Sequence, residues 1–475
     1  MFEGPSSEGP VLSVFGTEIG FVEKKTVGGG ALDALCRRDE RELRGVEGAA
    51  PYSHTNSERS FLCFTPGENN AIIAGQIKCF AFLKSKEGTR AVRRIWNGLT
   101  EFYRRGDLLL LFLCVVTTVF GIVIIASATR YSGSSRYLIV QSAALVLGIL
   151  LYVAVSLLDI EILAEHRELL LAFNVLFMSL LLVWGVEGNT GNRAWLDLPL
   201  LPVNIQPAEI CKITFVIALA KTMSNNRNKL SSVKSVASIA FQTVFMMGLI
   251  VVISRDAGSA VVFLFIFLVV AYVGGVRAGW FLLGLALAAA AFPILWKYFI
   301  QDHQKERILM LFDETIDPSG KGVRWDTNRS IAMLSGGGIS GQGLFHGSML
   351  QNHAIAAQHT DFIFSAIGEE LGILGCLFTL LLLTAIVARC IHVGIRTPNY
   401  MNRLICVGIA AMLIFQILIN VGMCIGVAPV IGLTLPFVSY GGSSIITLYL
   451  AMGLISSIHM RPDPEAKSPY IQPRY

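Results

Sequence analysis

The feature that most constrains this chain is a series of apolar blocks, each long enough to cross a lipid bilayer. A spanning helix needs roughly 20 residues. Hydrophobic residues make up 53% of the 475 residues and charged residues 15%, against about 25% charged in a soluble domain. The sequence therefore predicts an all-α polytopic integral membrane protein, with about ten transmembrane helices and a large outer loop between the seventh and eighth. We place the ten at 107–128, 137–157, 168–186, 208–223, 237–254, 257–275, 279–299, 361–388, 404–427 and 441–459.

The chain divides by composition into three parts. Residues 1–100 are polar and Gly-rich without a sustained hydrophobic period, so we expect a poorly structured cytoplasmic extension, and the contrast also fits an over-long translation start. Residues 101–460 form the predicted transmembrane domain and residues 461–475 a cytoplasmic tail. The first residues lack the basic and apolar regions of a signal peptide, so we expect no cleavage on export. The 9 cysteines show no paired spacing, which predicts neither a disulfide framework nor a zinc site.

Lys and Arg residues gather in alternate connections between the apolar blocks. Cytoplasmic loops carry an excess of these residues, and the bias predicts both termini in the cytoplasm and the long connection at 300–361 outside. The net charge of +5 is spread over such loops, so we expect no nucleic-acid partner. With this topology the polar clusters fall on the outer face, at 191–195 with 206–209, at 255–258, at 300–361 and at 429–444.

The strongest cluster reads Gln-His-Thr-Asp-Phe-Ile-Phe at 358–364, where the eighth apolar block begins. Two interpretations of Asp361 are open. A carboxylate at the start of a helix meets the positive end of the helix dipole as a cap, and a carboxylate facing a water-filled cavity can act as a general base. Glu369 and Glu370 follow about 12 Å deeper, at about 1.5 Å per residue. Charge at that depth is normally paired or functional.

A second cluster reads Gln-Pro-Ala-Glu-Ile-Cys-Lys at 206–212. Pro207 suits the first turn of a helix, and Glu209 and Lys212 are spaced to pair on one helix face. An ion pair that lets a short span insert is the favoured interpretation, and a substrate contact is the alternative. Just before this cluster lie Trp195, typical of an interfacial anchor, and Arg193, whose planar donor fork could bind phosphate.

Glycines and prolines mark two further outer segments. The glycine-rich run at 335–343 is not a Walker loop, because it lacks the Gly-Lys-Ser/Thr ending and a preceding strand. Its backbone could approach an anion, turn tightly in a re-entrant loop or serve as a flexible linker. The apolar segment 429–444 carries two prolines and paired glycines, so we expect a folded-back loop buried in protein or lining a cavity. Asn420, within the ninth block, needs a polar partner.

These clusters, in this order, resemble the SEDS family (shape, elongation, division and sporulation) of ten-helix membrane proteins. The resemblance runs from about residue 107 to residue 459. It is most specific at His-Thr-Asp-Phe-Ile-Phe (359–364), Glu-Glu-Leu-Gly (369–372) and Pro-Phe-Val-Ser-Tyr-Gly-Gly-Ser-Ser (436–444). It implies a glycosyltransferase of the bacterial cytoplasmic membrane that polymerises lipid II into peptidoglycan strands on the outer face. The implied partner is a class B penicillin-binding protein of the elongation or division machinery.

The resemblance also implies a site. The family's essential aspartate falls on Asp361, which would remove the proton from the acceptor sugar's hydroxyl. No organic cofactor is implied, although a divalent cation, Mg²⁺ or Mn²⁺, could assist the departure of undecaprenyl pyrophosphate. The residues expected to contact lipid II or the undecaprenyl-linked glycan are Arg193, Trp195, Gln206, Glu209, Lys212, Asp256, His359, Glu369, Glu370, Ser439 and Ser443.

The chain departs from the family pattern at several outer positions. Arg255 replaces a usual proline and Arg329 a usual glutamine, and either could supply a phosphate contact or lie on the surface. The segments 347–351 and 359–360 favour an elongation-type member over a division-type one. The remaining departures are Ala194 for arginine and Ala356-Ala357 for Pro-Glu.

Two other functions remain open at this point. A transporter that flips lipid II would also use a polar cavity with buried charges, but alternating access predicts essential groups near the midplane and on both faces. A non-catalytic protein that only anchors and activates the penicillin-binding protein predicts no effect of Asp361 substitutions. The one-sided clustering of the polar residues favours the glycosyltransferase.

Overall fold

The computed structural model describes residues 86–187, 192–197, 204–298 and 301–461, except 314, 316, 318, 321 and 323. Contacts divide the chain into two units, Met1–Lys78 and Cys79–Tyr475. The first unit and the tail after residue 461 lie outside the described residues, as do the predictions made for them. All elements named below belong to the second unit.

Helices dominate the described residues, and nine of them are long and apolar enough to cross a membrane. This confirms the predicted all-α polytopic membrane protein. The nine are α4 (Leu108–Ala128), α5 (Arg136–Ser156), α7 and α8 together (Arg167–Ser179, Leu181–Trp184), α10 (Val233–Ser254), α11 (Ala257–Gly274), α12 (Ala278–Tyr298), α16 (Ile363–Arg396), α17 (Tyr400–Cys424) and α18 (Gly442–Met460).

The predicted fourth span, 208–223, differs from the others. It forms α9 (Pro207–Asn225), which is not among the nine because its 19 residues include Glu209, Lys212 and Lys221. Most of its side chains are buried, and it packs against α7 and α17. Neighbouring helices therefore shield α9 along its length, which is why it can be less apolar than a helix that faces lipid.

Two predicted boundaries are corrected. The third block was expected to run to residue 186, but the helix ends at Trp184 because β1 (Gly185–Val186) pairs antiparallel with β2 (Trp195–Leu196). The eighth block was expected to end at 388, whereas α16 continues to Arg396 and is broken at Gly372, where φ is 64°. The connection before α16 is itself partly helical, with α13 (Asp302–Leu309), α14 (Trp325–Gly337) and α15 (Ser348–Gln351).

Residues 86–105 also differ from the expectation of a poorly structured extension up to residue 100. They form α3 (Lys86–Arg105). Phe102 is buried, and its ring meets the ring of Tyr152 on α5 edge-on at 6.0 Å. This aromatic contact attaches the helix to the bundle. The remaining described helices are short: η2 (Arg130–Ser132), α6 (Ile160–Glu165) and η3 (Arg227–Lys229).

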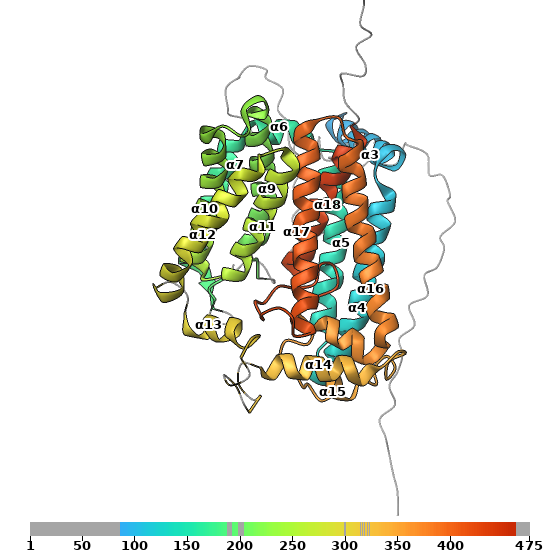
Figure 1. Cartoon of the computed structure of the whole chain (residues 1–475). Helices are drawn as coiled ribbons and strands as arrows, with labels where there is room; N and C mark the ends of the chain where they lie inside the picture. Colours follow the sequence, from blue (N-terminus) through green and yellow to red (C-terminus); the bar gives the residue numbers. More distant parts are fainter. Residues whose placement is uncertain are drawn as a thin grey trace, which may run out of the picture. The chain divides into compact units, whose positions relative to one another are not determined.

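The spanning helices pack side by side (Figure 1), with α18 against α5, α16 against α17 and α17 against α11. At one end, α14 and α15 lie across the start of α16, and we call this the Asp361 end. At the other, the α6 end, Arg389 Nε donates to both carboxylate oxygens of buried Asp107, at 3.1 and 2.8 Å. This ion pair joins the start of α4 to the second half of α16.

Candidate active site

Asp361 lies in the connection between α15 and α16 and is part-buried. The N-cap residue of α16 is Phe362, and no side chain caps that helix. The cap interpretation of Asp361 is therefore wrong. The carboxylate instead faces the segment after α17, where a Cβ placed on Gly432 would lie 3.6 Å from Asp361 Oδ2. The absence of a side chain at Gly432 leaves space beside the carboxylate.

Three consecutive main-chain oxygens around Asp361 accept hydrogen bonds. Tyr440 N donates to His359 O at 3.0 Å and Ser439 Oγ to Thr360 O at 2.6 Å. Asn420 Nδ2 donates to Asp361 O at 2.8 Å. Buried main-chain groups are nearly always paired, and here the pairs come from two other parts of the chain. They fix the backbone that carries Asp361 without using its carboxylate.

The segment after α17 is irregular, as predicted, and of the two alternatives burial in protein holds for residues 435–439, whereas Gly432 is exposed. Ser439 organises it, because its Oγ also accepts from Leu435 N at 2.9 Å. Gln141, fully buried on α5, donates to Ser439 O and accepts from Gly441 N, both at 3.1 Å. No sequence signal marks Gln141, since a single glutamine within an apolar block forms no pattern. Ser443 is buried at the start of α18, and its Oγ has no partner among the described residues.

Burial, with a smaller contribution from neighbouring charges, raises the pKa of the Asp361 carboxyl group. Burial raises the pKa of Asp361 from 3.8 to about 6, the positive charge of Arg307 lowers it, and the carboxylates of Asp256 and Asp326 raise it further. Burial also raises the pKa of Asp326, against the effects of Arg307 and Arg329. His359 has its pKa lowered by burial, which favours the neutral imidazole beside Asp361.

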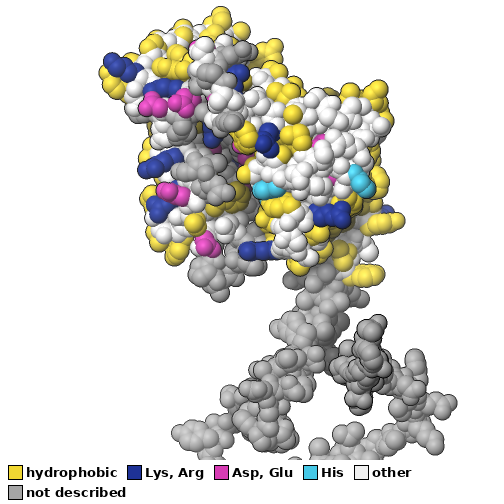
Figure 2. Space-filling model, turned by 90° about the horizontal axis from the view of Figure 1, so that it is seen from below, with side chains coloured by type: hydrophobic (Ala, Val, Ile, Leu, Met, Phe, Trp, Pro, Cys, Tyr) yellow, Lys and Arg dark blue, Asp and Glu magenta, His cyan; other side chains and the backbone are white. Residues whose placement is uncertain are grey.

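Arg307 and Asp326 are functional candidates that sequence reasoning missed. Arg307 lies on α13, and its Nη1 donates to Val430 O at 3.0 Å, in the segment that the Asp361 carboxylate faces. Asp326 lies in the first turn of α14. Both come from the long connection, where no periodic pattern singles out a residue. Figure 2 shows this end of the bundle: Lys, Arg, Asp and Glu side chains are most frequent on the side of α10 to α13, across a hollow from the side that holds the histidines.

Asp256 and Gln206 come together next to this site. Asp256 caps α11 by accepting from Ser259 N at 3.0 Å and Ser259 Oγ at 2.6 Å. Gln206 Nε2 donates to Asp256 Oδ2 at 3.4 Å. A Cβ on Gly258 would lie 2.6 Å from Ile431 O, so the start of α11 touches the segment that Asp361 faces. Of the predicted site residues, the structure thus gathers Gln206, Asp256, His359, Asp361 and Ser439.

Glu209 and Lys212 form a buried ion pair of 2.7 Å in the first turns of α9. Lys212 is 0% exposed and Glu209 5%. The favoured interpretation, a self-compensated pair, matches this geometry. Their contact with substrate stays a prediction, and the pair follows Gln206 directly in the chain.

Arg193 and Trp195 lie at the β1–β2 hairpin that precedes α9. Trp195 belongs to β2 and pairs with Val186. Arg193 Nε donates to Gly185 O at 3.0 Å. Residues 188–191 and 198–203 around them lie outside the described residues, and the substrate contacts of both side chains stay predictions.

Glu369 and Glu370 hold the long connection to the bundle. Glu369 Oε1 accepts from Met349 N at 2.7 Å and Oε2 from Leu350 N at 2.9 Å, in the first turn of α15. Glu370 Oε1 accepts from Ser127 Oγ of α4 at 2.6 Å. Both glutamates are 0% exposed. The structure thus brings them against α15 and α4 and gives each a positioning role, whereas substrate binding by either stays a prediction.

The glycine-rich run at 335–343 packs backbone against backbone on the start of α16. A Cβ on Gly337 would lie 1.8 Å from Gly368 O, and one on Gly341 would lie 2.1 Å from Glu370 O. Main-chain bonds cross the same contact, from Gly343 N to Glu370 O at 2.9 Å and from Ile373 N to Gly338 O at 3.0 Å. The glycines here permit close approach of two backbones, which does not fit a flexible linker, while anion binding and a re-entrant loop stay predictions.

Histidines in the same connection do not converge. His353 stacks on Tyr131 with ring centroids 3.9 Å apart, whereas His359 meets Tyr137 edge-on at 4.9 Å. Among the described residues, no group of three or more His, Cys, Asp or Glu side chains could hold a metal ion. A protein-held cation site of that kind does not fit the described residues, and the predicted divalent cation remains untested. Arg255 is exposed, and Arg329 stacks on Trp325 with its guanidinium 3.8 Å from the ring centroid.

The fold and this site define a polytopic membrane protein with a carboxylate of raised pKa at one end of the bundle. Residues 107–463 match the model of a family described as "Cell cycle protein", labelled for FtsW, RodA and SpoVE. The match covers most of the chain. The chain belongs to this family.

Named relatives support the same assignment. The chain is 35% identical over 280 residues to peptidoglycan glycosyltransferase MrdB of Escherichia coli (strain K12), covering 58% of this chain and 74% of MrdB. It is 31% identical over 343 residues to peptidoglycan glycosyltransferase RodA of Mycobacterium tuberculosis (strain ATCC 25618 / H37Rv), covering 67% and 71%. It is 28% identical over 366 residues to a probable peptidoglycan glycosyltransferase FtsW of Geobacter sulfurreducens (strain ATCC 51573 / DSM 12127 / PCA), covering 75% and 96%.

Solved structures show the same fold. A chain from a peptidoglycan synthase complex, described as coordinating polymerization and crosslinking, matches with a TM-score of 0.65 and 33% identity, covering 76% of this chain and 99% of that one. The rod shape determining protein RodA of Thermus thermophilus matches with a TM-score of 0.56 and 30% identity, covering 75% and 97%.

Proposed function

We propose that the protein is a peptidoglycan glycosyltransferase that polymerises lipid II into glycan strands at the outer face of the bacterial cytoplasmic membrane. The observation that carries the proposal is Asp361, a part-buried carboxylate with a pKa raised to about 6, whose backbone is held by donors from two other segments. The names of the relatives, all peptidoglycan glycosyltransferases, give the substrate class.

Asp361 acts as the general base in this reaction. Its carboxylate takes the proton from the acceptor sugar's 4-hydroxyl while that oxygen attacks the anomeric carbon of the lipid-linked strand. The bond from the anomeric carbon to the pyrophosphate breaks, and undecaprenyl pyrophosphate leaves with the electron pair. A base is most efficient when its pKa lies near the working pH, and burial moves Asp361 toward that condition.

Cationic side chains at the Asp361 end can stabilise the leaving pyrophosphate. Lys212 Nζ is engaged with Glu209 at 2.7 Å. Arg193 uses only its Nε, on Gly185 O, for a bond within the described residues, so its terminal nitrogens remain for phosphate. Arg307 lies close enough to Asp361 to influence its charge.

The proposed placement follows the positive-inside bias of the sequence. Both termini then lie in the cytoplasm, and the Asp361 end of the bundle faces outward. A class B penicillin-binding protein is the proposed partner, supported by the solved synthase complex that coordinates polymerization with crosslinking. The elongation role is favoured over the division role because MrdB and RodA match at 35% and 31% identity, against 28% for FtsW.

The transporter is the second candidate, and the positions of the buried charges argue against it. The two buried ion pairs among the described residues lie at opposite ends of the bundle, Glu209–Lys212 at the Asp361 end and Asp107–Arg389 at the α6 end. Alternating access predicts binding groups near the midplane as well as on both faces, and neither of these two ion pairs lies near the midplane.

The deciding experiment is lipid II polymerisation by the purified protein, alone and with its penicillin-binding protein. We expect wild type to form glycan strands and Asp361→Asn to lose at least about 100-fold in rate, the range of general base catalysis. Glu306→Gln, an exposed acid on α13, is the matched control and should retain activity. Strand synthesis by Asp361→Asn would remove Asp361 from the base role, and lipid II crossing vesicles without polymerisation would favour the transporter. Parallel reactions with EDTA and with added Mg²⁺ or Mn²⁺ test the cation.

A further inference from the structure

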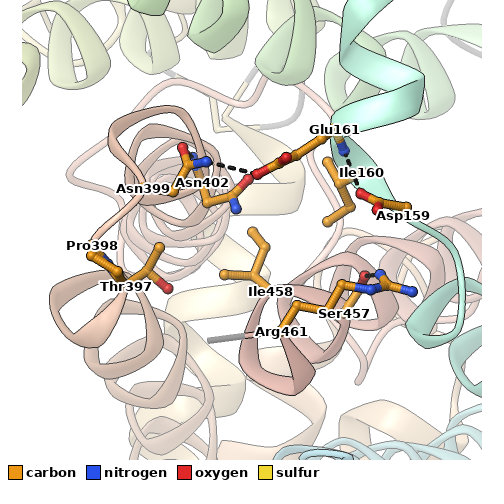
Figure 3. Close-up of a pocket in the computed structure, with 10 residues that line it drawn as sticks. All are labelled: Asp159, Ile160, Glu161, Thr397, Pro398, Asn399, Asn402, Ser457, Ile458 and Arg461. Carbon is orange, nitrogen blue, oxygen red and sulfur yellow. Dashed lines mark hydrogen bonds between the residues drawn. The ribbon is translucent and has the colours of Figure 1, made fainter. Parts of the chain in front are cut away.

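A polar pocket lies at the α6 end of the bundle, between α6, the start of α17 and the end of α18 (Figure 3). Asn402, in the first turn of α17, lines it, whereas Asn420 near the other end of α17 contacts Asp361. The 18 residues between them correspond to about 27 Å at a rise of about 1.5 Å per residue. The pocket is therefore separate from the site of Asp361.

Asn402 gives the first indication of a ligand. Its side chain is only 8% exposed, and its Oδ1 has no hydrogen-bond partner among the described residues. Buried polar atoms without a partner are uncommon in native proteins, and each such atom calls for a specific explanation. A ligand that brings a hydrogen-bond donor into the pocket would give Asn402 Oδ1 its missing partner.

Two carboxylates stand beside it. Glu161 Oε1 accepts from Asn399 Nδ2 at 2.7 Å, and Asp159 Oδ1 accepts from Glu161 N at 2.9 Å. Neither carboxylate has an ion-pair partner in the part of the chain that the structure describes. Figure 3 shows Glu161, Asn399 and Asn402 meeting on one side of the pocket. Acceptors thus gather on this side, and the cation that lines the pocket, Arg461, is bonded to main-chain and hydroxyl oxygens instead of to these carboxylates.

The groups that could attract an anion are already occupied. Arg461 donates to Leu157 O at 2.6 Å and to Ser457 Oγ at 2.7 Å, and also to Leu158 O. The first amides of α17 donate to Asn399 Oδ1, with Met401 N at 2.9 Å. The pocket consequently offers two carboxylates and the unpartnered Asn402 Oδ1, while the donors of Arg461 and of the first turn of α17 are engaged. A metal ion is a poor match, because the described residues form no cluster of three or more His, Cys, Asp or Glu ligands.

We propose that this pocket binds an arginine side chain from a partner protein that docks on the α6 end of the bundle. A guanidinium is planar, permanently charged and carries five N–H donors, so it can bind a carboxylate and an amide oxygen together. Glu161 supplies the charge, Asn402 Oδ1 the buried acceptor, and Asp159 the second negative charge at the rim. Such a contact places the partner at the opposite end of α17 from Asp361.

The test uses the full chain in detergent micelles and three blocked pentapeptides, Gly-Gly-Xaa-Gly-Gly, with arginine, lysine or citrulline at the centre. Citrulline keeps the shape of arginine but has no charge. We expect the arginine peptide to bind and to raise the Tm, and the citrulline peptide to bind at least tenfold more weakly. Binding of arginine and citrulline peptides with equal affinity, or of neither, would overturn the proposal.

Two variants locate the binding. Glu161→Gln retains an acceptor for Asn399 but loses the charge, and should lower the affinity for the arginine peptide at least tenfold. Glu165 is an exposed acid at the end of α6, and Glu165→Gln should leave that affinity unchanged. Asn402→Leu should raise the Tm of the free protein and abolish the shift caused by the peptide. An unchanged affinity in Glu161→Gln would contradict the proposed site even if Asn402→Leu failed to fold.

Discussion

Asn420 Nδ2 donates to the main-chain oxygen of Asp361 at 2.8 Å and to that of Leu433 at 2.7 Å. One amide on a spanning helix thus joins the backbone of the proposed base to the segment that its carboxylate faces. Sequence reasoning required a polar partner for Asn420 but could not say which one, because both acceptors belong to irregular segments distant in the chain.

Replacing Asn420 by leucine should disturb the site without removing Asp361. Two buried oxygens would lose a donor, at about 1–3 kcal/mol for each group left unsatisfied. A small displacement of a catalytic group can reduce a rate by about 100-fold, so we expect a polymerisation rate at least tenfold below wild type, with a lower Tm. Gln416→Leu, one turn earlier on α17, is the control: Gln416 is buried and its Oε1 has no partner among the described residues. Equal effects of the two variants would mean that the Asn420 bonds do not position the site.

Polymerisation should depend on pH through Asp361. The carboxylate is the active form, and burial raises its pKa to about 6. The rate should therefore fall below about pH 6, by roughly tenfold per pH unit. Full activity down to pH 5 would show that another group acts as the base.

The raised pKa of Asp361 also predicts how the stability of the protein depends on pH. The folded state binds the Asp361 proton more tightly than the unfolded state, whose pKa is near 3.8. This contribution to stability is complete below pH 3.8 and is lost as the pH rises through about 6. Asp361→Asn should therefore melt at or above the wild-type Tm at pH 8, and the advantage should disappear near pH 4. A variant less stable than wild type at pH 8 would contradict the burial argument.

The contact between the glycine-rich run and α16 should tolerate no side chain at its centre. Gly337→Ala would place a Cβ 1.8 Å from Gly368 O, whereas Gly336→Ala would place one 3.4 Å from the mobile end of Gln342. Overpacking against backbone typically costs about 1–3 kcal/mol or more. We expect Gly337→Ala to lower both the Tm and the activity, and Gly336→Ala to resemble wild type. Thermal unfolding of the two variants in detergent measures the difference.

Glu369 should stabilise the folded conformation of the long connection before α16. Glu369→Ala removes the acceptor for Met349 N and Leu350 N, so hydrogen exchange at α15 should become faster and polymerisation slower by about tenfold or more. Glu369→Gln keeps an oxygen acceptor and should recover part of both properties. If exchange at α15 were unchanged in Glu369→Ala while activity was lost, a direct contact of Glu369 with substrate would be the better explanation.

The ion pair between Asp107 and Arg389 should stabilise the bundle at the α6 end. Asp107 is 0% exposed at its side chain and Arg389 19%. Breaking a buried pair by removing one partner costs about 3–5 kcal/mol, because the other charge stays buried. We expect Arg389→Leu to destabilise the protein strongly, and the double variant with Asp107→Leu to recover part of the loss. A double variant as unstable as the sum of the single ones would show that the two charges do not interact.

The sequence by itself determined the membrane fold and the position of most spanning helices, and it singled out Asp361 as the candidate base. These conclusions depend on local patterns: blocks of about 20 apolar residues must be helical because lipid offers no hydrogen bonds. Motifs that are contiguous in the chain, such as 359–364, remain recognisable without knowing what they contact.

Only the tertiary structure decided what these residues touch. It placed Arg307, Gln141 and Asp326 around the site although no pattern marks them, and it showed that Phe362 rather than Asp361 occupies the N-cap of α16. It also showed that the side chain of Glu369, on α16, accepts hydrogen bonds from the first turn of α15. The physical reason is that hydrogen bonds, burial and charge act between groups close in space, and in this bundle those groups come from segments hundreds of residues apart in the chain, as Gln141 and Ser439 do.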